Sequence, residues 1–531
     1  MDLPSAILDW QTLLGPSGVL LGSAAQQVYG LDASGIQRVI PAALRIIDAD
    51  ALPPAMRIAS RYQVPVYPIS TGHNWGYGTA MPARDGCVIV DLSALQKIIH
   101  FDAEFGVVTV EPGVTQGMLA DFLDADNYPY MVPVTGAGPT CSLMGNALER
   151  GYGITPHADH FGAVTDIEAV LADGSLYRTA LREAGGEDLA RLFKWGIGPY
   201  SAGMFTQSGF GIVTRMSIVL ARRPEAIKVC LFSLRNDALL EPAVERIRAI
   251  LRMLPGTVGA INLMNRHRVL AMAAPFPADR LGPDGLIPPA VIETLGRQYQ
   301  AQPWTGFATL YGSRRVVAAA QREMQSTLAG VASRVLFLTP GQTRALQSIA
   351  GWLPGAMGRR LVSTAATLAG AIGLARGRPN ETALPLAYWR NPAPPKGRCR
   401  DPSRDGCGLI WYAPLVAMRP AGVRDYVEMV RKLSLEHHIE PLITLTSISD
   451  KLFDSTVPLL FDRTNPHALR SAWACYHAMV EAGHDLGCFP YRLGVGAMRH
   501  AASTSTSAGA LHGRLRATLD PHDILAPGRY A

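Results

Sequence analysis

The chain has 531 residues, of which 48% are hydrophobic and 17% are charged. This composition excludes a disordered chain and a nucleic-acid-coating protein, and the length predicts two or more domains. The formal net charge of +6 is small for this size, so it predicts only a mildly basic surface that attracts anionic ligands.

Targeting and redox signals are few. The N-terminal MDLPSAILDWQ has no basic segment followed by an apolar one, so we expect no signal peptide and a cytoplasmic location. The seven cysteines are scattered without a CxxC pair, which argues against a zinc site or a disulfide framework. The apolar stretch at 361–375 is about 15 residues long, shorter than the roughly 20 of a membrane span. We interpret it as a buried or interface helix, with membrane-surface or partner contact as the alternative.

The first 220 residues alternate between helical and strand-like patterns. LPPAMRIASRY predicts an amphipathic helix, and VPVYPIS and CVIVDLS predict short buried strands. GVVTVEPG predicts a strand that ends in a Pro-Gly turn, followed by a helix that Thr115 caps. VTDIEAVLADGSLYRT, residues 164–179, predicts a hairpin around Asp173 and Gly174.

From Pro224 onward the pattern changes to strong amphipathic helices separated by strands. LLEPAVERIRAILRML and GVRDYVEMVRKLSLEHH predict helices, whereas KVCLFSLRN, LIWYAP and PLITLTSIS predict strands. This pattern is typical of an α+β domain in which helices cover an antiparallel sheet. The Pro-, Gly- and Arg-rich stretch 375–406 predicts a long surface loop.

Two glycine-rich loops carry the first functional signal. STGHNWGYG at 70–78 and VTGAGPTCSLMGNALERGYG at 134–153 each lie between a strand and a helix-like segment. Glycines let successive backbone N–H groups converge on an anion. Two such loops suit a long diphosphate-bearing cofactor better than a mononucleotide, and a structural turn remains the alternative for each.

Several other sites are excluded or weak. GAGPTC and GVGAMRHA lack the third glycine of a dinucleotide fingerprint, and there is no P-loop and no GxSxG motif. His437 and His438 have no companion at metal spacing, so we expect no metal. Tyr491 beside Arg492 can hold an oxyanion through two donors, unless the pair is an ordinary surface feature.

Together these segments resemble the flavoproteins of the vanillyl-alcohol oxidase and p-cresol methylhydroxylase (PCMH) family. The similarity is carried, in order along nearly the whole chain, by PISTGHNWGYG, GNALERGYGITPHADH, GIGPYSAGMFTQSGFGIVT, PYR and DPHDILAPGR. The resemblance implies an α+β fold with a PCMH-type FAD-binding domain and a substrate (cap) domain whose antiparallel sheet is flanked by helices. It implies an FAD domain from 1–222 and 489–531, with the cap domain at 223–488.

The resemblance also implies which residues bind FAD. The first loop would hold the pyrophosphate through Ser70, Thr71, Gly72, His73 and Asn74. The second segment would line the flavin through Gly138, Thr140, Ser142, Gly145, Asn146, Gly151 and Ile154. A third stretch, with Ser208, Gly209 and Ile212, would flank the adenosine part.

Phenol-oxidising members of the family bind a phenolate oxygen through a tyrosine in GYG and a Tyr-Arg pair. Tyr77, Tyr491 and Arg492 match these positions. Arg529 matches the residue whose charge stabilises the reduced flavin near N1 and C2=O. A cation and hydroxyl donors lower the pKa of a phenol, and hydride leaves the para carbon more easily from a phenolate.

The chain departs from the family in its acid and cysteine positions. Phenol-oxidising members carry an acid before the GN motif, but no acid lies between Asp126 and Glu149. Glu149, His157 and His160 are the candidate substitutes for that acid, and a structural role for each is the alternative. The loop also resembles the berberine-bridge-enzyme branch, whose flavin-linking cysteine would fall at Gly138. Cys141 is three positions away, so we expect no cysteinyl link.

The second departure concerns the covalent flavin link. The cap-domain histidine or tyrosine that carries flavin in close relatives is replaced by Leu409. GHN aligns instead with the GHS of berberine-bridge and cytokinin-dehydrogenase relatives, whose histidine is bonded to the flavin. We therefore predict a covalent FAD on His73, with a noncovalent lining histidine as the alternative.

The predicted function is FAD-dependent hydride removal from a para-substituted phenol through a quinone methide. The alternatives are a berberine-bridge-like oxidase of a natural-product intermediate, and a flavin subunit that passes electrons to a cytochrome or another acceptor protein. The basic loop from Arg390 to Arg404 would dock such a partner unless it is an ordinary solvated loop. We expect a homodimer that binds no nucleic acid and does not span a membrane.

Overall fold

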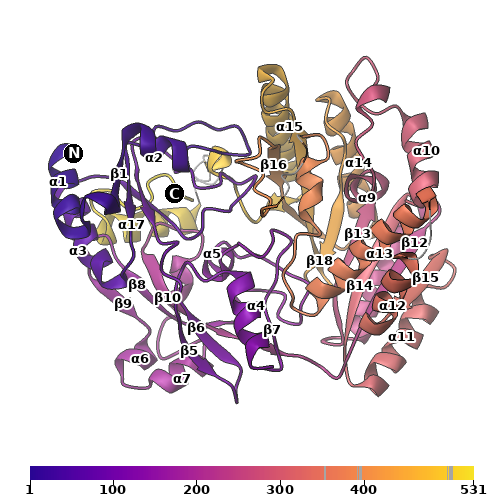
Figure 1. Ribbon diagram of the computed structural model, residues 1–531, viewed down its shortest axis with the longest axis horizontal. Helices are drawn as coiled ribbons and strands as arrows, with labels where there is room; N and C mark the ends of the chain where they lie inside the picture. Colours follow the sequence, from indigo (N-terminus) through magenta and orange to yellow (C-terminus); the bar gives the residue numbers. More distant parts are fainter. Residues whose placement is uncertain (352–354, 392, 394–396, 499, 501–505, 531) are drawn as a thin grey trace.

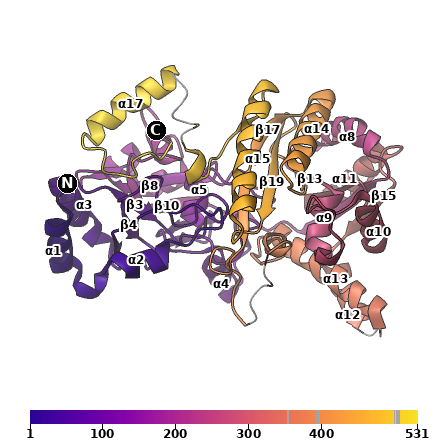
Figure 2. The ribbon, with the colours of Figure 1, turned by 90° about the horizontal axis from the view of Figure 1, so that it is seen from above.

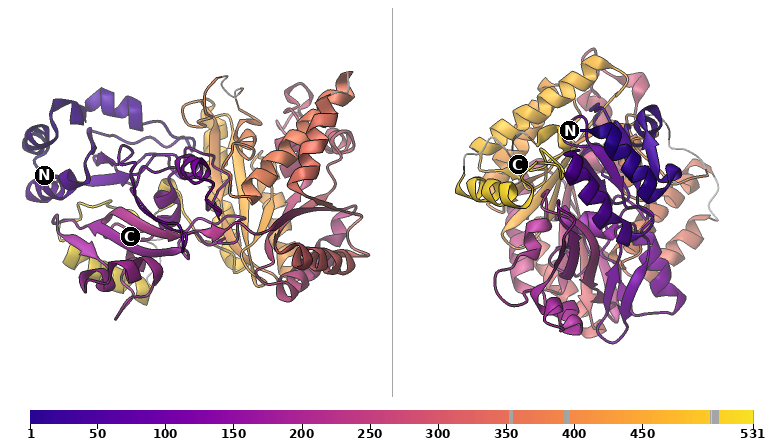
Figure 3. Two further views of the ribbon diagram at one scale, coloured as in Figure 1. Left: turned by 60° about the horizontal axis from the view of Figure 1, so that its bottom comes forward. Right: turned by 90° about the vertical axis from the view of Figure 1, so that its left-hand side faces the viewer.

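The computed structural model describes the chain except residues 352–354, 392, 394–396, 499, 501–505 and 531. Elements up to residue 222 form one half of the molecule, and most of the later elements form the other half (Figure 1). The C-terminal segment returns to the first half, where it lies among N-terminal elements (Figure 1, Figure 3).

The N-terminal sheet has the order β1-β2-β4-β3, with β2, β3 and β4 parallel. Its central strands are apolar because both faces are buried. Helix α3 packs its apolar stripe on this sheet and ends at Gln63, which adopts the left-handed conformation. The elements are α1 (Leu3–Leu14), η1 (Pro16–Gly18), β1 (Val19–Leu21), α2 (Gly22–Tyr29), β2 (Ala42–Arg45), η2 (Ala49–Ala51), α3 (Leu52–Tyr62), β3 (Val66–Ile69) and β4 (Val88–Asp91).

A second, antiparallel sheet follows, with the order β5-β6-β10-β8-β9. The predicted hairpin is confirmed as β8 and β9, and Thr115 caps α4 by accepting from Met118 N, as predicted. Ser142 caps α5 in the same way through Gly145 N. The elements are β5 (Ile98–Asp102), β6 (Val107–Val110), α4 (Gln116–Ala125), β7 (Tyr130–Met131), α5 (Leu143–Leu148), β8 (Val164–Val170), β9 (Leu176–Arg178), α6 (Ala180–Glu183), α7 (Glu187–Leu192), η3 (Ala202–Phe205), β10 (Ile212–Val219) and β11 (Ala221–Arg222).

The other half contains a large antiparallel sheet of order β15-β12-β14-β13-β18-β19-β17-β20, with β16 paired to β19. Helices α8, α11, α14 and α15 cover one face, and their apolar stripes form the largest core with it. Its strands are β12 (Ala226–Leu234), β13 (Val258–Asn265), β14 (Trp304–Gly312), β15 (Arg334–Leu338), β16 (Gly408–Tyr412), β17 (Pro414–Ala417), β18 (Thr444–Ser447), β19 (Leu452–Phe461) and β20 (Phe489–Pro490).

The helices of this half lie on both sides of the sheet, and α12 and α13 project from the rest of the molecule (Figure 2). The helices are η4 (Asp237–Leu239), α8 (Leu240–Met253), α9 (Arg266–Ala273), η5 (Ala278–Arg280), α10 (Pro289–Tyr299), α11 (Arg314–Leu328), α12 (Pro340–Gly351), α13 (Gly355–Ala375), η6 (Leu384–Tyr388), α14 (Pro420–Glu436) and α15 (Pro466–Asp485). The predicted arrangement of helices on an antiparallel sheet is confirmed.

One loop prediction is wrong in its centre. The stretch 375–406 contains η6, whose Leu386, Ala387 and Tyr388 are buried against α9 and β16. Its prolines and glycines suggested an exposed loop, but its apolar residues find a surface that only the fold provides. The apolar stretch 361–375 lies in α13, where Ala365, Ile372 and Ala375 are buried. No helix in the described part of the chain is long and apolar enough to cross a membrane.

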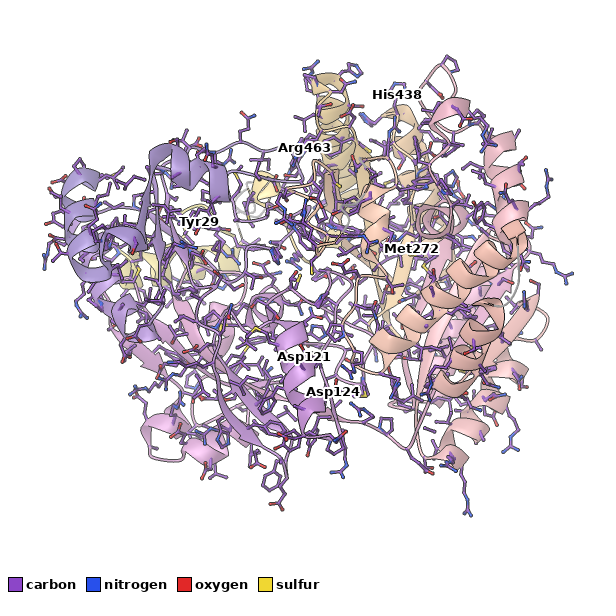
Figure 4. All side chains as sticks on the ribbon, in the orientation of Figure 1. Tyr29, Asp121, Asp124, Met272, His438 and Arg463 are labelled. Carbon is purple, nitrogen blue, oxygen red and sulfur yellow. The ribbon has the colours of Figure 1, made fainter. Side chains whose placement is uncertain are left out.

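Two sets of hydrogen bonds connect distant parts of the chain. Arg463, labelled in Figure 4, donates to the carbonyls of Asp32 and Ser403, which belong to different halves. The C-terminal segment follows η7 (Val495–Ala497) and α17 (Ser507–Leu519) and then crosses β3. There Val66 N donates to Ile524 O and Ala526 N donates to Val66 O. This crossing sets the position of the last residues of the chain.

The buried carboxylate of Asp520 holds this crossing by accepting from Ile524 N at 3.0 Å and from Leu525 N at 2.8 Å. We expect Asp520→Ala to lower the free energy of unfolding by about 2–3 kcal/mol, because it leaves two buried N–H groups without acceptors. Urea unfolding of the holoprotein measures the change. Asp121→Ala, at an exposed aspartate of α4 (Figure 4), is the matched control. Equal midpoints for the two variants would contradict this role.

Candidate active site

A cavity of about 420 Å³ lies between the two halves and takes residues from both. Its lining includes the loop after β3, the loop before α5 and strand β10 of the first half. The second half contributes α9, η6, β16 and β19, and the chain end contributes Tyr491, Arg492 and Arg529. A cavity lined by both apolar side chains and convergent polar groups suits a small substrate beside a cofactor.

The two glycine-rich loops meet at this cavity. Gly72 and Gly76 have φ of 68° and 77°, which side-chain-bearing residues rarely adopt. A Cβ on Gly145 would lie 2.5 Å from Ser70 Oγ, so only glycine allows the loops to approach. The result is a glycine-rich wall of the cavity, which fits a cofactor that carries phosphates.

Most residues predicted to bind the cofactor line this cavity. They are Ser70, Thr71, Gly72, His73, Asn74, Ser142, Gly145, Asn146, Gly151, Ser208, Ile212 and Arg529. Four predicted residues lie outside the lining. Thr140 O accepts from His73, and Ile154 O accepts from Tyr311. Gly138 faces Leu384, and Gly209 packs against the C-terminal crossing at Leu525.

His73 is held in one orientation. Its Nδ1 lies 3.1 Å from Thr140 O, and its ring stacks on Trp75 at 5.1 Å. A carbonyl oxygen only accepts, so Nδ1 carries the proton and Nε2 carries the lone pair. Burial lowers the pKa of His73, against the nearby Asp401 carboxylate. The ring is therefore neutral at pH 7, with Nε2 as its nucleophilic atom.

Leu409 lines the same cavity, beside the loop that carries His73. A Cβ on Gly76 would lie 3.0 Å from Leu409 Cγ and 2.4 Å from Trp411 Cδ1, so glycine is required for β16 to approach. Cys141 also lines the cavity, and burial raises the pKa of its thiol to about 12. Its Sγ donates to Ala137 O at 3.4 Å, so it is present as a thiol.

The predicted phenol-binding residues come together across the two halves. The Arg492 guanidinium lies 4.3 Å from the centre of the Tyr77 ring, and it donates to Asn74 Oδ1. Tyr491 packs its ring edge-on against Tyr152 at 5.6 Å. Burial raises the pKa of Tyr77 and of Tyr491, so both hydroxyls are protonated donors at pH 7.

Glu149 joins the two arginines that the family resemblance implies for the site. It forms ion pairs with Arg492, at 3.4 Å, and with Arg529, and Tyr530 donates to it at 3.3 Å. Arg529 also donates to Tyr67 OH at 2.9 Å. Because Glu149 is paired with two cations, its geometry is that of a shared counter-ion. The other two substitutes, His157 and His160, do not line the cavity, and burial lowers the pKa of His160 to about 4.

The sequence interpretation missed Asp454, an acid near the start of β19. Its carboxyl faces the cavity, where it lies 3.5 Å from Tyr491 OH. Burial raises its pKa to about 7, although hydrogen bonding from Tyr491 and the charge of Arg492 act in the opposite direction. The sequence does contain a signal for this residue: an acidic side chain directly follows two hydrophobic residues in the predominantly apolar segment LFDSTVPLLF.

Comparisons with known proteins agree with this site. A protein-family model described as "FAD binding domain" matches residues 41–180. The chain is 32% identical to 1'-carboxy-chondrochloren decarboxylase of Chondromyces crocatus, over 99% of this chain and 97% of that one. It is 26% identical to the 4-cresol dehydrogenase [hydroxylating] flavoprotein subunit of Pseudomonas putida, over 99% of this chain and 95% of the relative.

Solved structures share the whole fold. The substrate-bound crystal structure of p-cresol methylhydroxylase superposes with a TM-score of 0.87, at 26% identity, covering 99% of this chain and 96% of the other. A 4-ethylphenol oxidase from Gulosibacter chungangensis, in complex with isoeugenol, also gives 0.87 at 22% identity, covering 99% and 97%. At 22% identity, the similarity to the 4-ethylphenol oxidase shows a shared fold and nothing further.

The glycine-lined cavity, the matched FAD-binding region and these full-length similarities define an FAD-dependent oxidoreductase. The chain belongs to the p-cresol methylhydroxylase and vanillyl-alcohol oxidase family of flavoproteins. The predicted family, fold class and cofactor are thereby confirmed.

The raised pKa of Asp454 has a consequence for stability. Between the unfolded pKa of 3.8 and the folded pKa of about 7, the folded state binds the extra proton, so stability falls as pH rises through this window. We expect Asp454→Asn, which keeps the shape without the charge, to gain stability relative to the wild type across this window. The gain is on the order of 4 kcal/mol above pH 7. Urea unfolding at pH 5 and pH 8 measures it.

The matched control is Asp121→Asn, at an exposed aspartate of α4. An Asp454→Asn protein whose stability relative to the wild type is the same at both pH values would contradict the raised pKa.

Proposed function

We propose that this protein removes a hydride from the carbon attached para to the hydroxyl of a phenol, through a quinone-methide intermediate of the substrate. One observation carries the proposal. Tyr77, Tyr491 and Arg492, contributed by two distant segments, converge on one cavity that also contains a carboxyl group. When bound, FAD supplies the hydride acceptor.

The three residues suit a phenolate oxygen. Arg492 is a buried cation, and the Tyr77 and Tyr491 hydroxyls remain protonated donors. A cation and two donors around one oxygen lower the pKa of a bound phenol, because they stabilise its anion in a low-dielectric site. The electron pair of the phenolate then assists departure of hydride from the para carbon. The arrangement thus stabilises the reacting form as well as binding it.

Asp454 is the proposed acceptor of the phenolic proton. Tyr491 OH lies between the proposed phenolate position and the Asp454 carboxyl, 3.5 Å from it. A group with a pKa of about 7 accepts and returns a proton near neutral pH. We assign Asp454 this role, in place of the acid that is missing before the GN motif.

The relatives support a phenolic substrate in the words of their names. One is a 4-cresol dehydrogenase subunit, and the p-cresol methylhydroxylase structure at 26% identity has substrate bound. Electron transfer to a partner protein has less support from the predicted docking loop. Arg398 pairs with Asp405 and Arg400 pairs with Glu381, so these charges are neutralised within the chain. Residues 392 and 394–396 of that loop lie outside the described residues.

The second candidate function is an oxidative decarboxylation, which the 32% identical decarboxylase favours. The chemistry is compatible with the same site. When a carboxylate sits on the carbon next to the benzylic one, hydride loss gives a quinone methide. Cleavage of the carbon–carboxylate bond then releases CO₂, and its electron pair forms the alkene as the ring returns to the phenolate. Both candidates need the same phenol-binding residues.

We also propose that His73 carries FAD covalently. Its side chain lines the cavity with Nε2 unprotonated, and Leu409 stands where the family resemblance implies the linking residue of close relatives. A neutral, oriented imidazole is the form that bonds to carbon.

The primary test is anaerobic reduction of the bound flavin by 4-ethylphenol, followed by its absorbance. We expect bleaching in the wild type and a rate at least tenfold lower in Tyr491→Phe, because the phenolate loses a donor and its proton route. The matched control is Tyr412→Phe, at a buried tyrosine of β16 that does not line the cavity. No bleaching by any 4-alkylphenol, with or without a carboxylate, would overturn the proposed function.

The flavin link is tested by intact-mass analysis after denaturation. We expect the wild-type chain to have the mass of the protein plus FAD and His73→Ala to have the mass of the protein alone. His157→Ala, at a histidine outside the cavity lining, is expected to keep the adduct. Apoprotein mass for the wild type, purified with yellow flavin bound, would show that the cofactor is noncovalent.

A further inference from the structure

One charged group of the cavity is not used by the proposed chemistry. Arg268 of α9 lines the cavity from the second half of the molecule, and its exposed fraction is 8%. Its Nε donates to Thr444 Oγ1 at 2.9 Å. Its Nη1 is buried and has no hydrogen-bond partner among the described residues.

Arg268 also lacks a counter-ion. It forms no ion pair with any described carboxylate, and burial lowers its pKa to about 10 with no nearby charge opposing this. Asp454 is not its partner, since the charge that acts on the pKa of Asp454 is that of Arg492. A buried guanidinium without an anion is unfavourable, because both its hydration and its charge pairing are lost.

The local structure does not explain this cation either. Arg268 is in the first turn of α9, where Asn265 Oδ1 accepts from its backbone N–H. A positive side chain at this end of a helix is opposed by the helix dipole. Helix propensity and capping therefore give no reason for an arginine at this position. An anion that enters the cavity would satisfy the unpaired Nη1 and the charge together.

Arg268 lies on the same side of the large sheet as Asp454. Thr444, its acceptor, is paired across the sheet with Thr456, and Thr456 and Asp454 both line the cavity. Apolar residues of the lining, Leu386, Leu409 and Trp411, come from η6 and β16. Besides Arg529, the cavity thus offers an apolar wall and two cations, Arg492 and Arg268, from different segments of the chain.

We propose that Arg268 binds a carboxylate on the side chain of the phenolic substrate, so that the enzyme selects acidic para-substituted phenols over neutral ones. This inference rests on the proposed function for the phenol end of the ligand. It goes beyond it by assigning a specificity residue and a substrate class. Arg268 acts as a binding residue, and the reacting carbon is served by the other residues of the site.

The assignment is compatible with both candidate reactions. If the carboxylate is on the carbon next to the benzylic one, as in 3-(4-hydroxyphenyl)propanoate, loss of the benzylic hydride, for which bound FAD would be the acceptor, followed by loss of CO₂ gives 4-vinylphenol. The carbon–carboxylate electron pair becomes the alkene, and the phenolate regains the proton. If the carboxylate is one carbon nearer or farther, Arg268 still binds it, but no CO₂ leaves by this route.

The test compares two ligands that differ in charge alone, 3-(4-hydroxyphenyl)propanoate and 3-(4-hydroxyphenyl)propanamide, on the FAD-loaded enzyme. Apparent Kd is obtained from the concentration dependence of anaerobic flavin reduction, and independently from the ligand-induced shift in Tm. We expect the wild type to prefer the carboxylate by tenfold or more. Release of CO₂ is expected from the propanoate and not from 4-hydroxyphenylacetate.

Variants at Arg268 test whether this residue causes the preference for the carboxylate over the amide. In Arg268→Met we expect binding of the propanoate to weaken about ten- to a hundredfold, whereas binding of the amide and of 4-ethylphenol changes less than threefold. Arg268→Lys keeps the charge without the planar fork and is expected to fall between the two. Arg266→Met removes a charge from the same helix outside the cavity lining and is expected to keep the wild-type preference.

The outcomes separate this inference from its alternatives. Equal affinity of the wild type for the propanoate and the amide would overturn it. Equal weakening of both ligands in Arg268→Met, with a lower Tm, would show a structural arginine instead. Equal stabilisation of the wild type by inorganic phosphate or acetate alone would show an adventitious ion only. Weaker FAD binding in Arg268→Met would assign the guanidinium to the cofactor.

Failure of the proposed function has a different signature. If neither ligand bleaches the flavin, the hydride-transfer proposal fails. The Tm shifts still report whether Arg268 distinguishes the carboxylate from the amide.

Discussion

The site is organised around one buried carboxylate, that of Glu149, which lies between the guanidinium groups of Arg492 and Arg529. Two largely shielded cations so close together would repel each other without a shared counter-ion. Glu149 follows α5, whereas both arginines come from the distant C-terminal end of the chain. The ion pairs therefore bring the C-terminal segment to the second glycine-rich loop. The crossing of Ile524 and Ala526 over β3 anchors the same segment from the other side.

The pairing of Glu149 with two arginines also bears on the roles proposed for the other charged residues of the cavity. Because Glu149 is already paired with two arginines, we assign the proposed proton transfer to Asp454 on β19 instead. The two acids differ in environment: Glu149 is surrounded by cations, whereas burial dominates at Asp454 and raises its pKa to about 7. Arg268 is a third kind of group, a cation with no acid of its own among the described residues. A cavity that contains both a free cation and a proton acceptor is matched to a ligand that carries an anion and a phenol.

The fold and much of the site followed from local sequence patterns. The glycines of the two loops, the cap at Thr115 and the hairpin at Asp173 and Gly174 are local features, since each depends on residues a few positions apart. The Tyr-Arg pair was recognisable for the same reason. The buried role of η6 was not, because its burial depends on α9 and β16. Asp454 was not predicted, since an acid on a strand shows its burial only when the facing segments are known.

By itself, the sequence determined the family, the FAD cofactor and the set of side chains around Tyr77, Tyr491 and Arg492, because these are carried by ordered motifs. Tertiary structure alone decided which charges are paired. Within the described part of the chain, Glu149 acquires two partners and Arg268 acquires none, although nothing in their neighbouring residues distinguishes them. Charge pairing in a buried site depends on distances between segments far apart in the chain, and those distances exist only after the two halves have closed on one cavity.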